Sequence, residues 1–143
     1  MLVPLSPDLF HWTALDVIHK RHLNGYAIRI KAGLVLIDPP SVPENSLPEL
    51  EALGRPRIVI LSGRAGERRA KQFVDWYGAR VLAPEADQKL LRLPIAQYYR
   101  SGDTLPGGLK AIQLPDQRTP GEAVLLHSAT QSLIAGHLVG EPA

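Results

Sequence analysis

The apolar and polar positions in the first third of the chain predict two paired strands. Residues 26–30 alternate apolar and polar side chains, whereas residues 34–38 are apolar up to Asp38. The short loop between them contains Gly33, so the two strands are predicted to form a hairpin. The first strand should have one solvated face and the second should be buried. Two prolines follow Asp38 and end the second strand there.

The middle of the chain changes to helical spacing. Ser46 and Glu49 have the spacing of a capping box, which predicts a short helix to about Leu53, ended by Gly54. An apolar strand is predicted at residues 58–61. Apolar residues at helical spacing then predict a second helix that ends at Gly78; they are Ala70, Phe73, Val74 and Tyr77.

A strand at residues 81–83 and a short helix at 85–91 come next. This order of strand, helix and strand favours a right-handed crossover and a parallel strand pair. After Pro94 the pattern indicates strands joined by turns, at residues 97–100, 109–114, 123–127 and 132–139. Mixed strands with a few covering helices are typical of an α/β sandwich.

Composition places these elements in one globular domain spanning residues 1–143, with 45% hydrophobic and 21% charged residues. A net charge of +2 does not indicate a nucleic-acid partner, and the basic residues around 64–71 are expected to form a solvated face. Disulfides, zinc ribbons and thiol catalysis are excluded because the chain has no cysteine. The sequence shows neither a signal peptide nor an apolar run of about 18 residues, so no membrane partner and a cytoplasmic location are expected.

A series of short segments, taken in order, resembles the metallo-β-lactamase-like hydrolases. The resemblance runs from about residue 8 to the end of the chain, and it implies an αββα sandwich that is incomplete at the C-terminus. The segments that carry it are residues 24–26 (Asn-Gly-Tyr), 33–39 (Gly-Leu-Val-Leu-Ile-Asp-Pro), 59–62 (Val-Ile-Leu-Ser), 77–85, 101–103 (Ser-Gly-Asp), 114–122 and 133–137 (Leu-Ile-Ala-Gly-His).

The resemblance also implies which residues stand at the family's metal site. Members of the family use a His-x-His-x-Asp-His loop, a later His and a bridging Asp to hold metal ions, which generate hydroxide near neutral pH. The matching positions hold Gly63, Ala65, Glu67 and Arg68 in the loop, Gln117 or Arg118 downstream, and His137 at the bridging carboxylate. Since this set contains at most two ligands, no bound metal and no other cofactor are expected.

The resemblance also leads to expectations for the catalytic and binding residues. The catalytic role is unassigned, with Asp38, Glu67 and His137 as its candidates. Asp38 either supports the metal loop by hydrogen bonding, as the resemblance implies, or caps the turn before the prolines. Residues expected to contribute to binding are Arg68, Gln117, Arg118 and Thr119.

Two alternatives stay open for the charged pair. Glu67 and Arg68 form an ion pair inside the former metal pocket, or they are two exposed charges in a first helical turn.

The remaining histidines are given structural roles. His11 is expected to be a packed or edge residue beside Phe10. Asp16, His19 and His22 are expected to form a surface cluster and not a metal site, and His127 is expected to be an exposed turn residue.

These observations favour a non-catalytic or strongly impaired relative of the family's hydrolases, a pseudoenzyme with a cleft for a small molecule or a protein. One alternative is an active hydrolase of ester, lactone or thioester bonds, with an atypical metal site around Glu67 and His137. The family's further C-terminal section is missing here, which leaves the last strand uncovered. A second alternative is therefore an assembly subunit, with a homo-oligomer, in the simplest case a dimer, formed at or beside residues 132–139.

Overall fold

The computed structural model describes residues 2–18, 20–115 and 120–135, except for the side chain of Arg68. Its helical elements are η1 (Glu44–Ser46), α1 (Leu47–Glu51), η2 (Arg64–Gly66), α2 (Glu67–Tyr77) and η3 (Glu85–Leu90). Its strands are β1 (Val3–Ser6), β2 (Leu9–Asp16), β3 (Arg21–Ile30), β4 (Gly33–Ile37), β5 (Pro56–Ile60), β6 (Arg80–Pro84), β7 (Gln97–Tyr99), β8 (Thr104–Leu105), β9 (Leu109–Gln113), β10 (Ala123–His127) and β11 (Ser132–Ala135).

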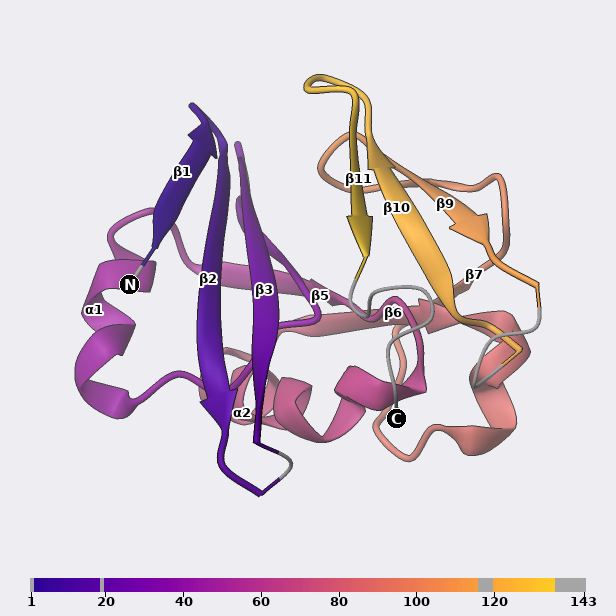
Figure 1. The fold of residues 1–143 in the computed structure, drawn as a ribbon, viewed down its shortest axis with the longest axis horizontal. Coiled ribbons are helices and arrows are strands. Elements are labelled where there is room, and N and C mark those ends of the chain that lie inside the picture. The colour runs from indigo at the N-terminus through magenta and orange to yellow at the C-terminus, as the bar shows by residue number, and fades with distance from the viewer. Residues whose placement is uncertain (1, 19, 116–119, 136–143) are drawn as a thin grey trace.

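The described strands form two sheets (Figure 1). One sheet runs β1 to β7 in chain order, with antiparallel pairing up to β4 and parallel pairing from β4 to β7. The other sheet has the order β11-β10-β9-β8 and is antiparallel. The predicted hairpin of β3 and β4 and the predicted parallel pair of β5 and β6 are thus confirmed.

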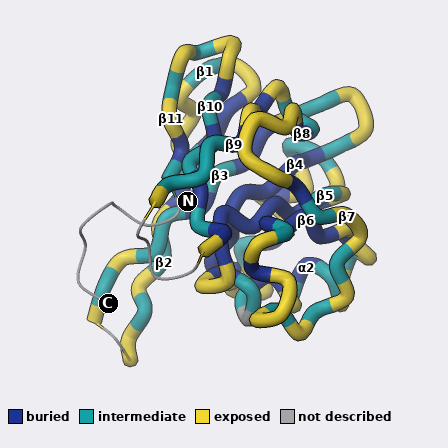
Figure 2. The backbone as a smooth tube through the Cα atoms, turned by 90° about the vertical axis from the view of Figure 1, so that its right-hand side faces the viewer, coloured by how far each residue is buried: buried dark blue, intermediate teal, exposed yellow. Residues whose placement is uncertain are grey.

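The strand β4 explains how the layers are joined. Leu34 and Leu36 point to one face of the large sheet and pack with residues of α1 and α2. Val35 and Ile37 point to the other face and pack with the second sheet. Both faces of this strand are covered, as its continuous apolar run predicts. Figure 2 shows the resulting buried interior around β4, β5 and β6.

The two apolar cores therefore define three layers: helices, large sheet and small sheet. The helix-side core includes Leu50 of α1 and Phe73 of α2, both without exposed surface. The core between the sheets includes Tyr99 and Leu125, which are equally buried. Each core removes many large apolar side chains from water, which is the main stabilising contribution to a fold of this size. No helix in the described part of the chain is long and apolar enough to cross a membrane.

Residues 2–18 hold the largest difference from the sequence prediction. They form β1 and β2, and β3 begins at Arg21, whereas strands were predicted only from residue 26. A close approach fixes this hairpin, because a Cβ at Gly25 would lie 2.5 Å from Pro40 Cδ and 2.9 Å from the Trp12 ring. Asp16 and His22 lie on the neighbouring strands β2 and β3.

The capping box at Ser46 is also not formed. Ser46 has helical backbone angles and its side chain makes no capping hydrogen bond. The three residues before α1 already form the short turn η1, so the chain enters the helix through that turn. The predicted helix is present, but it starts without the expected side-chain cap.

Candidate functional site

The candidate site lies where β4 and β5 end at neighbouring positions of the large sheet. The two strands are parallel, so Asp38 after β4 and Ser62 after β5 meet at one edge. Asp38 is buried and has a positive φ of 44°, a conformation that Asp tolerates better than most residues. Its Oδ1 accepts a hydrogen bond from the Ser62 amide at 2.9 Å, and its Oδ2 accepts one from Ser62 Oγ. The carboxylate thus holds the start of the loop after β5.

That loop presents no side-chain ligand at its first two expected positions. Gly63 is buried, and a Cβ there would lie 3.4 Å from Glu122 Cγ. Ala65 is exposed and carries only a methyl group. Gly66 follows, with its would-be Cβ 3.1 Å from Asp38 Oδ1. The loop therefore approaches the Asp38 carboxylate closely through glycine.

Glu67 is placed in the first turn of α2 and contacts a different part of the chain. Its Oε2 accepts hydrogen bonds from the amides of Arg92 at 2.6 Å and Leu93 at 2.9 Å. The carboxylate stabilises the segment that follows η3. Glu67 therefore connects the start of α2 to the segment after η3. The alternative in which Glu67 pairs with Arg68 involves a side chain outside the described part of the chain.

The remaining candidates also lie outside the described residues. They are Gln117, Arg118, Thr119 and His137. Among the residues that the structure does describe, no group of three or more His, Cys, Asp or Glu side chains converges as a metal site would require. The described donor set does not fit the three protein ligands of a catalytic zinc site, because Asp38 and Glu67 are held by backbone amides of different loops.

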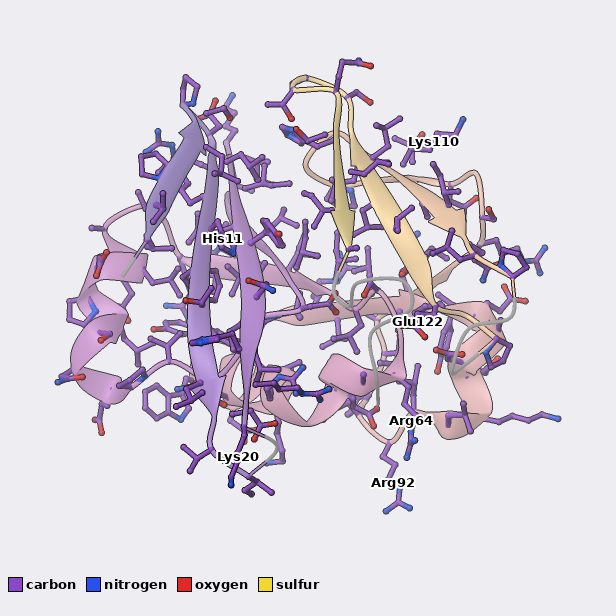
Figure 3. All side chains as sticks on the ribbon, viewed as in Figure 1. His11, Lys20, Arg64, Arg92, Lys110 and Glu122 are labelled. Carbon is purple, nitrogen blue, oxygen red and sulfur yellow. The ribbon has the colours of Figure 1, made fainter. Side chains whose placement is uncertain are left out.

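A cleft of about 1190 Å³ opens beside Asp38. One wall is the tip of the β2–β3 hairpin, where Val17 and Ile18 are 76% and 86% exposed. The opposite wall is the loop from Ser62 to Glu67, and Arg92 contributes to the rim. Figure 3 shows the hairpin tip around Lys20 and the side chains of Arg64 and Arg92, which extend away from the ribbon.

Arg69 of α2 is a cationic residue of this cleft that the sequence analysis did not select. Burial lowers its pKa, the neighbouring Arg21 lowers it further, and Asp38 and Asp16 act in the opposite direction. Arg69 lies next to Arg68 in the chain, and its charge interacts with the Asp38 carboxylate. The orientation of α2 against the sheet brings Arg69 to the cleft, and the sequence carried no signal for that orientation.

Asp87 is a second residue that the sequence analysis missed. It lies in η3, has no exposed surface, and accepts hydrogen bonds from the amides of Arg64 at 3.1 Å and Gly121 at 2.7 Å. Gly121 must be glycine here, because a Cβ would lie 2.5 Å from Pro84 Cβ and 2.8 Å from the Asp87 carboxyl carbon. Asp87 connects the loop after β5 to the loop before β10.

Tyr99 supports the same region from the core between the sheets. Its hydroxyl donates a hydrogen bond to the Leu61 carbonyl at 2.6 Å, and burial raises its pKa well above the ordinary value, with Asp38 and Asp87 adding to the effect. The pKa of Tyr26 is also raised, first by burial and then by Asp38. Both phenols therefore remain protonated beside the acidic site.

His11 and His127 have structural surroundings. His11 Nε2 lies 3.0 Å from Asn24 Oδ1, and its ring lies 5.0 Å from that of Tyr26. His127 is buried, with Nδ1 2.7 Å from Thr130 Oγ1, so its predicted place in an exposed turn is wrong. It is the last residue of β10, where pairing with β9 and β11 covers it. His19 lies outside the described residues.

The chain is a layered α/β sandwich, with helices on one face of a large mixed sheet and a second sheet on the other face. The chain belongs to the metallo-beta-lactamase superfamily, whose family model matches residues 2–143. The fold prediction is thereby confirmed. No curated protein sequence matches the chain.

Solved structures agree with this assignment at low sequence identity. A metallo-beta-lactamase from Pontibacter korlensis matches with a TM-score of 0.73 and 17% identity, covering 93% of this chain and 69% of that structure. One from Hirschia baltica gives a TM-score of 0.69 and 14% identity, with coverages of 93% and 68%. A beta-lactamase domain protein from Burkholderia ambifaria gives 0.75 and 12%, with coverages of 93% and 54%. The chain therefore spans between about half and about two thirds of these structures, an incomplete sandwich relative to them.

Proposed function

We propose that this protein is a non-catalytic or strongly impaired member of the superfamily that binds a small molecule in the cleft beside Asp38. The proposal rests on the hydrogen bonds that the two described acidic candidates, Asp38 and Glu67, accept. Asp38 holds Ser62, and Glu67 holds the amides of Arg92 and Leu93. Carboxylates engaged in this way position loops, while the cleft of about 1190 Å³ is of the size that accommodates a ligand.

The chemistry of the loop supports the same proposal. Hydrolases of this family need a metal-bound hydroxide, since bulk water at neutral pH is a poor nucleophile. Gly63 and Ala65 offer no ligating atom in their side chains, and Arg69 brings a fixed positive charge into the electrostatic surroundings of Asp38. A cation of the protein itself disfavours a second cation at the same carboxylate.

Two measurements test the proposal on the whole chain. Elemental analysis of protein purified without chelator is expected to find no stoichiometric zinc. Ester, lactone, thioester and β-lactam substrates, offered with and without added Zn²⁺, are expected to turn over at the background rate. The active-hydrolase alternative is supported instead if the protein holds about one zinc that is lost in Glu67→Ala or His137→Ala, or if metal-dependent turnover disappears in those variants.

A second candidate function is assembly through the small sheet. Among the described strands, β11 lies at the edge of that sheet, and its Leu133 is 66% exposed. An open edge with an exposed apolar side chain favours pairing with another chain. Light scattering at micromolar concentration is expected to give the mass of a dimer, and Leu133→Gln should shift it to that of a monomer. Lys110→Gln on β9 is the matched control and should leave the mass unchanged; a monomeric wild type would reject this candidate.

A further inference from the structure

The tip of the β2–β3 hairpin holds aliphatic side chains that the fold leaves in solvent. Val17 and Ile18, 76% and 86% exposed, are the most exposed large apolar residues in the described part of the chain, and Leu15 is 60% exposed. Other groups hold the turn: Asp16 Oδ1 accepts a hydrogen bond from the Ile18 amide at 3.1 Å, and Lys20 adopts a positive φ of 52°. Packing within this chain therefore does not explain the apolar tip, and adjacent exposed aliphatic residues are typical of an interaction surface.

Exposed cations from three separate segments lie on the same side of the molecule as this tip. Lys20 is in the hairpin turn, Arg64 begins η2, and Arg92 follows η3. Figure 3 shows their side chains extending toward the lower side of the view, where the hairpin tip and Arg92 reach furthest. None of the three forms an ion pair with another described residue. Arg64 and Arg92 line the cleft together with Val17 and Ile18, so the cations and the apolar tip border one opening.

The acidic side chains that line the cleft are held by the protein or lie behind this surface. Asp38 is buried, and Asp16 Oδ2 lies 3.9 Å from Arg21 Nε. Glu67 accepts hydrogen bonds from two backbone amides. Glu122 lies well back from the lower side of the view in Figure 3. The side that carries the hairpin tip thus presents aliphatic groups and cations to solvent.

A protruding apolar tip among exposed cations matches the chemistry of an anionic lipid bilayer. Aliphatic side chains gain free energy at the boundary between headgroups and acyl chains, and Lys and Arg gain from the negative potential of the surface. A flat surface can meet the hairpin tip and Arg92 together, because both reach furthest on the same side of the molecule. A protein partner needs a groove shaped to receive the tip, whereas a bilayer adapts to it. The lipid surface therefore fits both the shape and the charge.

We propose that this side of the molecule docks on an anionic lipid bilayer, with Val17 and Ile18 at the boundary of the acyl chains and Lys20, Arg64 and Arg92 against the lipid headgroups. The expectation of no membrane partner rested on spanning and targeting segments, and docking from one side of the bilayer needs neither. The docking surface is independent of the proposed function, because it forms the rim of the cleft and does not determine which ligand binds inside.

Co-sedimentation of the whole chain with vesicles tests this docking. Vesicles of phosphatidylcholine and phosphatidylserine should bind the protein at least about tenfold more strongly than vesicles of phosphatidylcholine alone, since each cation at an anionic surface contributes about fivefold. Lys20→Gln and Arg92→Gln should each weaken binding to the mixed vesicles about fivefold, and Ile18→Ser should weaken it about tenfold. Lys110→Gln is the cationic control, because Lys110 is exposed and lies on the opposite side of the molecule in Figure 3. Leu5→Ser is the apolar control, because Leu5 is 54% exposed on β1, away from the tip in Figure 1; neither control should change the binding.

Three results would overturn the inference: no binding to either kind of vesicle, equal binding to both kinds, or variants at the tip that bind no more weakly than the two controls. Urea midpoints of Ile18→Ser and Lys20→Gln should equal that of the wild type, since both side chains are exposed; if Ile18→Ser is destabilised, Val17→Ser takes its place. Light scattering distinguishes a second copy of the chain as the occupant, because a dimer that becomes a monomer in Ile18→Ser assigns the tip to self-association and rejects lipid docking. Zinc content and turnover still decide the proposed function separately.

Discussion

Replacing Asp87 with Asn tests whether this buried carboxylate joins the two loops of the site. The side chain keeps its shape, but an amide has one acceptor oxygen in place of two. Its NH₂ group must then face the amide of Arg64 or Gly121, both of which now donate to the carboxylate at 3.1 and 2.7 Å. Losing one charge-assisted hydrogen bond, weakening the other and leaving one buried donor unpaired should lower the free energy of unfolding by about 3 kcal/mol.

The assay is urea unfolding followed by circular dichroism, with thermal unfolding as a second measure. For a chain of 143 residues, a loss of about 3 kcal/mol corresponds to a fall in Tm of about 10 °C. Asp75→Asn is the matched control, because Asp75 is exposed and its contact is a surface ion pair with Lys71 at 2.7 Å. Such a pair contributes about 0–1 kcal/mol, so the control should change little.

Amide hydrogen exchange measures the local effect of the same substitution. The amides of Arg64 and Gly121 should exchange faster in Asp87→Asn by more than the global loss of stability explains, since both lose the acceptor that protects them. The reasoning is refuted if Asp87→Asn unfolds within 0.5 kcal/mol of the wild type, an outcome outside the range expected for a buried pair of charge-assisted bonds.

Three further variants test neighbouring interactions. Glu67→Ala should cost about 1 kcal/mol in urea unfolding, because two amides after η3 lose a partly exposed acceptor; an unchanged midpoint would show that these bonds contribute nothing. Tyr99→Phe should cost about 1–2 kcal/mol by removing the hydroxyl that bonds the buried Leu61 carbonyl, and a fully stable variant would contradict that. For Tyr77, burial and the hydrogen bond to Glu51 raise the pKa to about 12, so its stabilising effect is complete below the unfolded value of about 10 and is lost as pH rises toward 12. Tyr77→Phe should therefore reduce the fall in unfolding free energy between those pH values, and an identical slope in both proteins would refute the assignment.

The arrangement of the central strands could be predicted from local pattern. An apolar run such as residues 34–37 is typical of a strand covered on both faces, and β4 is such a strand. The helix before Gly78 was equally predictable, because its apolar residues recur at helical spacing and Gly78 adopts a left-handed conformation with φ of 64°. In both cases the signal lies within a few neighbouring residues.

The hairpin of β2 and β3 was harder to predict from the sequence. The strand β2 begins with two adjacent apolar residues, Leu9 and Phe10, because Phe10 and Trp12 pack in the helix-side core while Leu9 packs in the core between the sheets. The burial of His127 depends in the same way on two neighbouring strands, β9 and β11, that pair with it from other parts of the chain. Pairing between distant segments leaves only a weak trace in the local pattern.

The sequence alone determined the family and the residue types at the former metal positions, because Gly63 and Ala65 lack ligating side chains wherever the loop lies. Tertiary structure decided which charges meet. Asp87 reaches Gly121 across 34 residues, and Arg69 approaches Arg21 across 48 only because α2 packs under the hairpin of β2 and β3. Electrostatic and hydrogen-bond energies depend on the distance between the groups and on their burial. Neither the distance nor the burial can be obtained from the spacing of the residues along the chain.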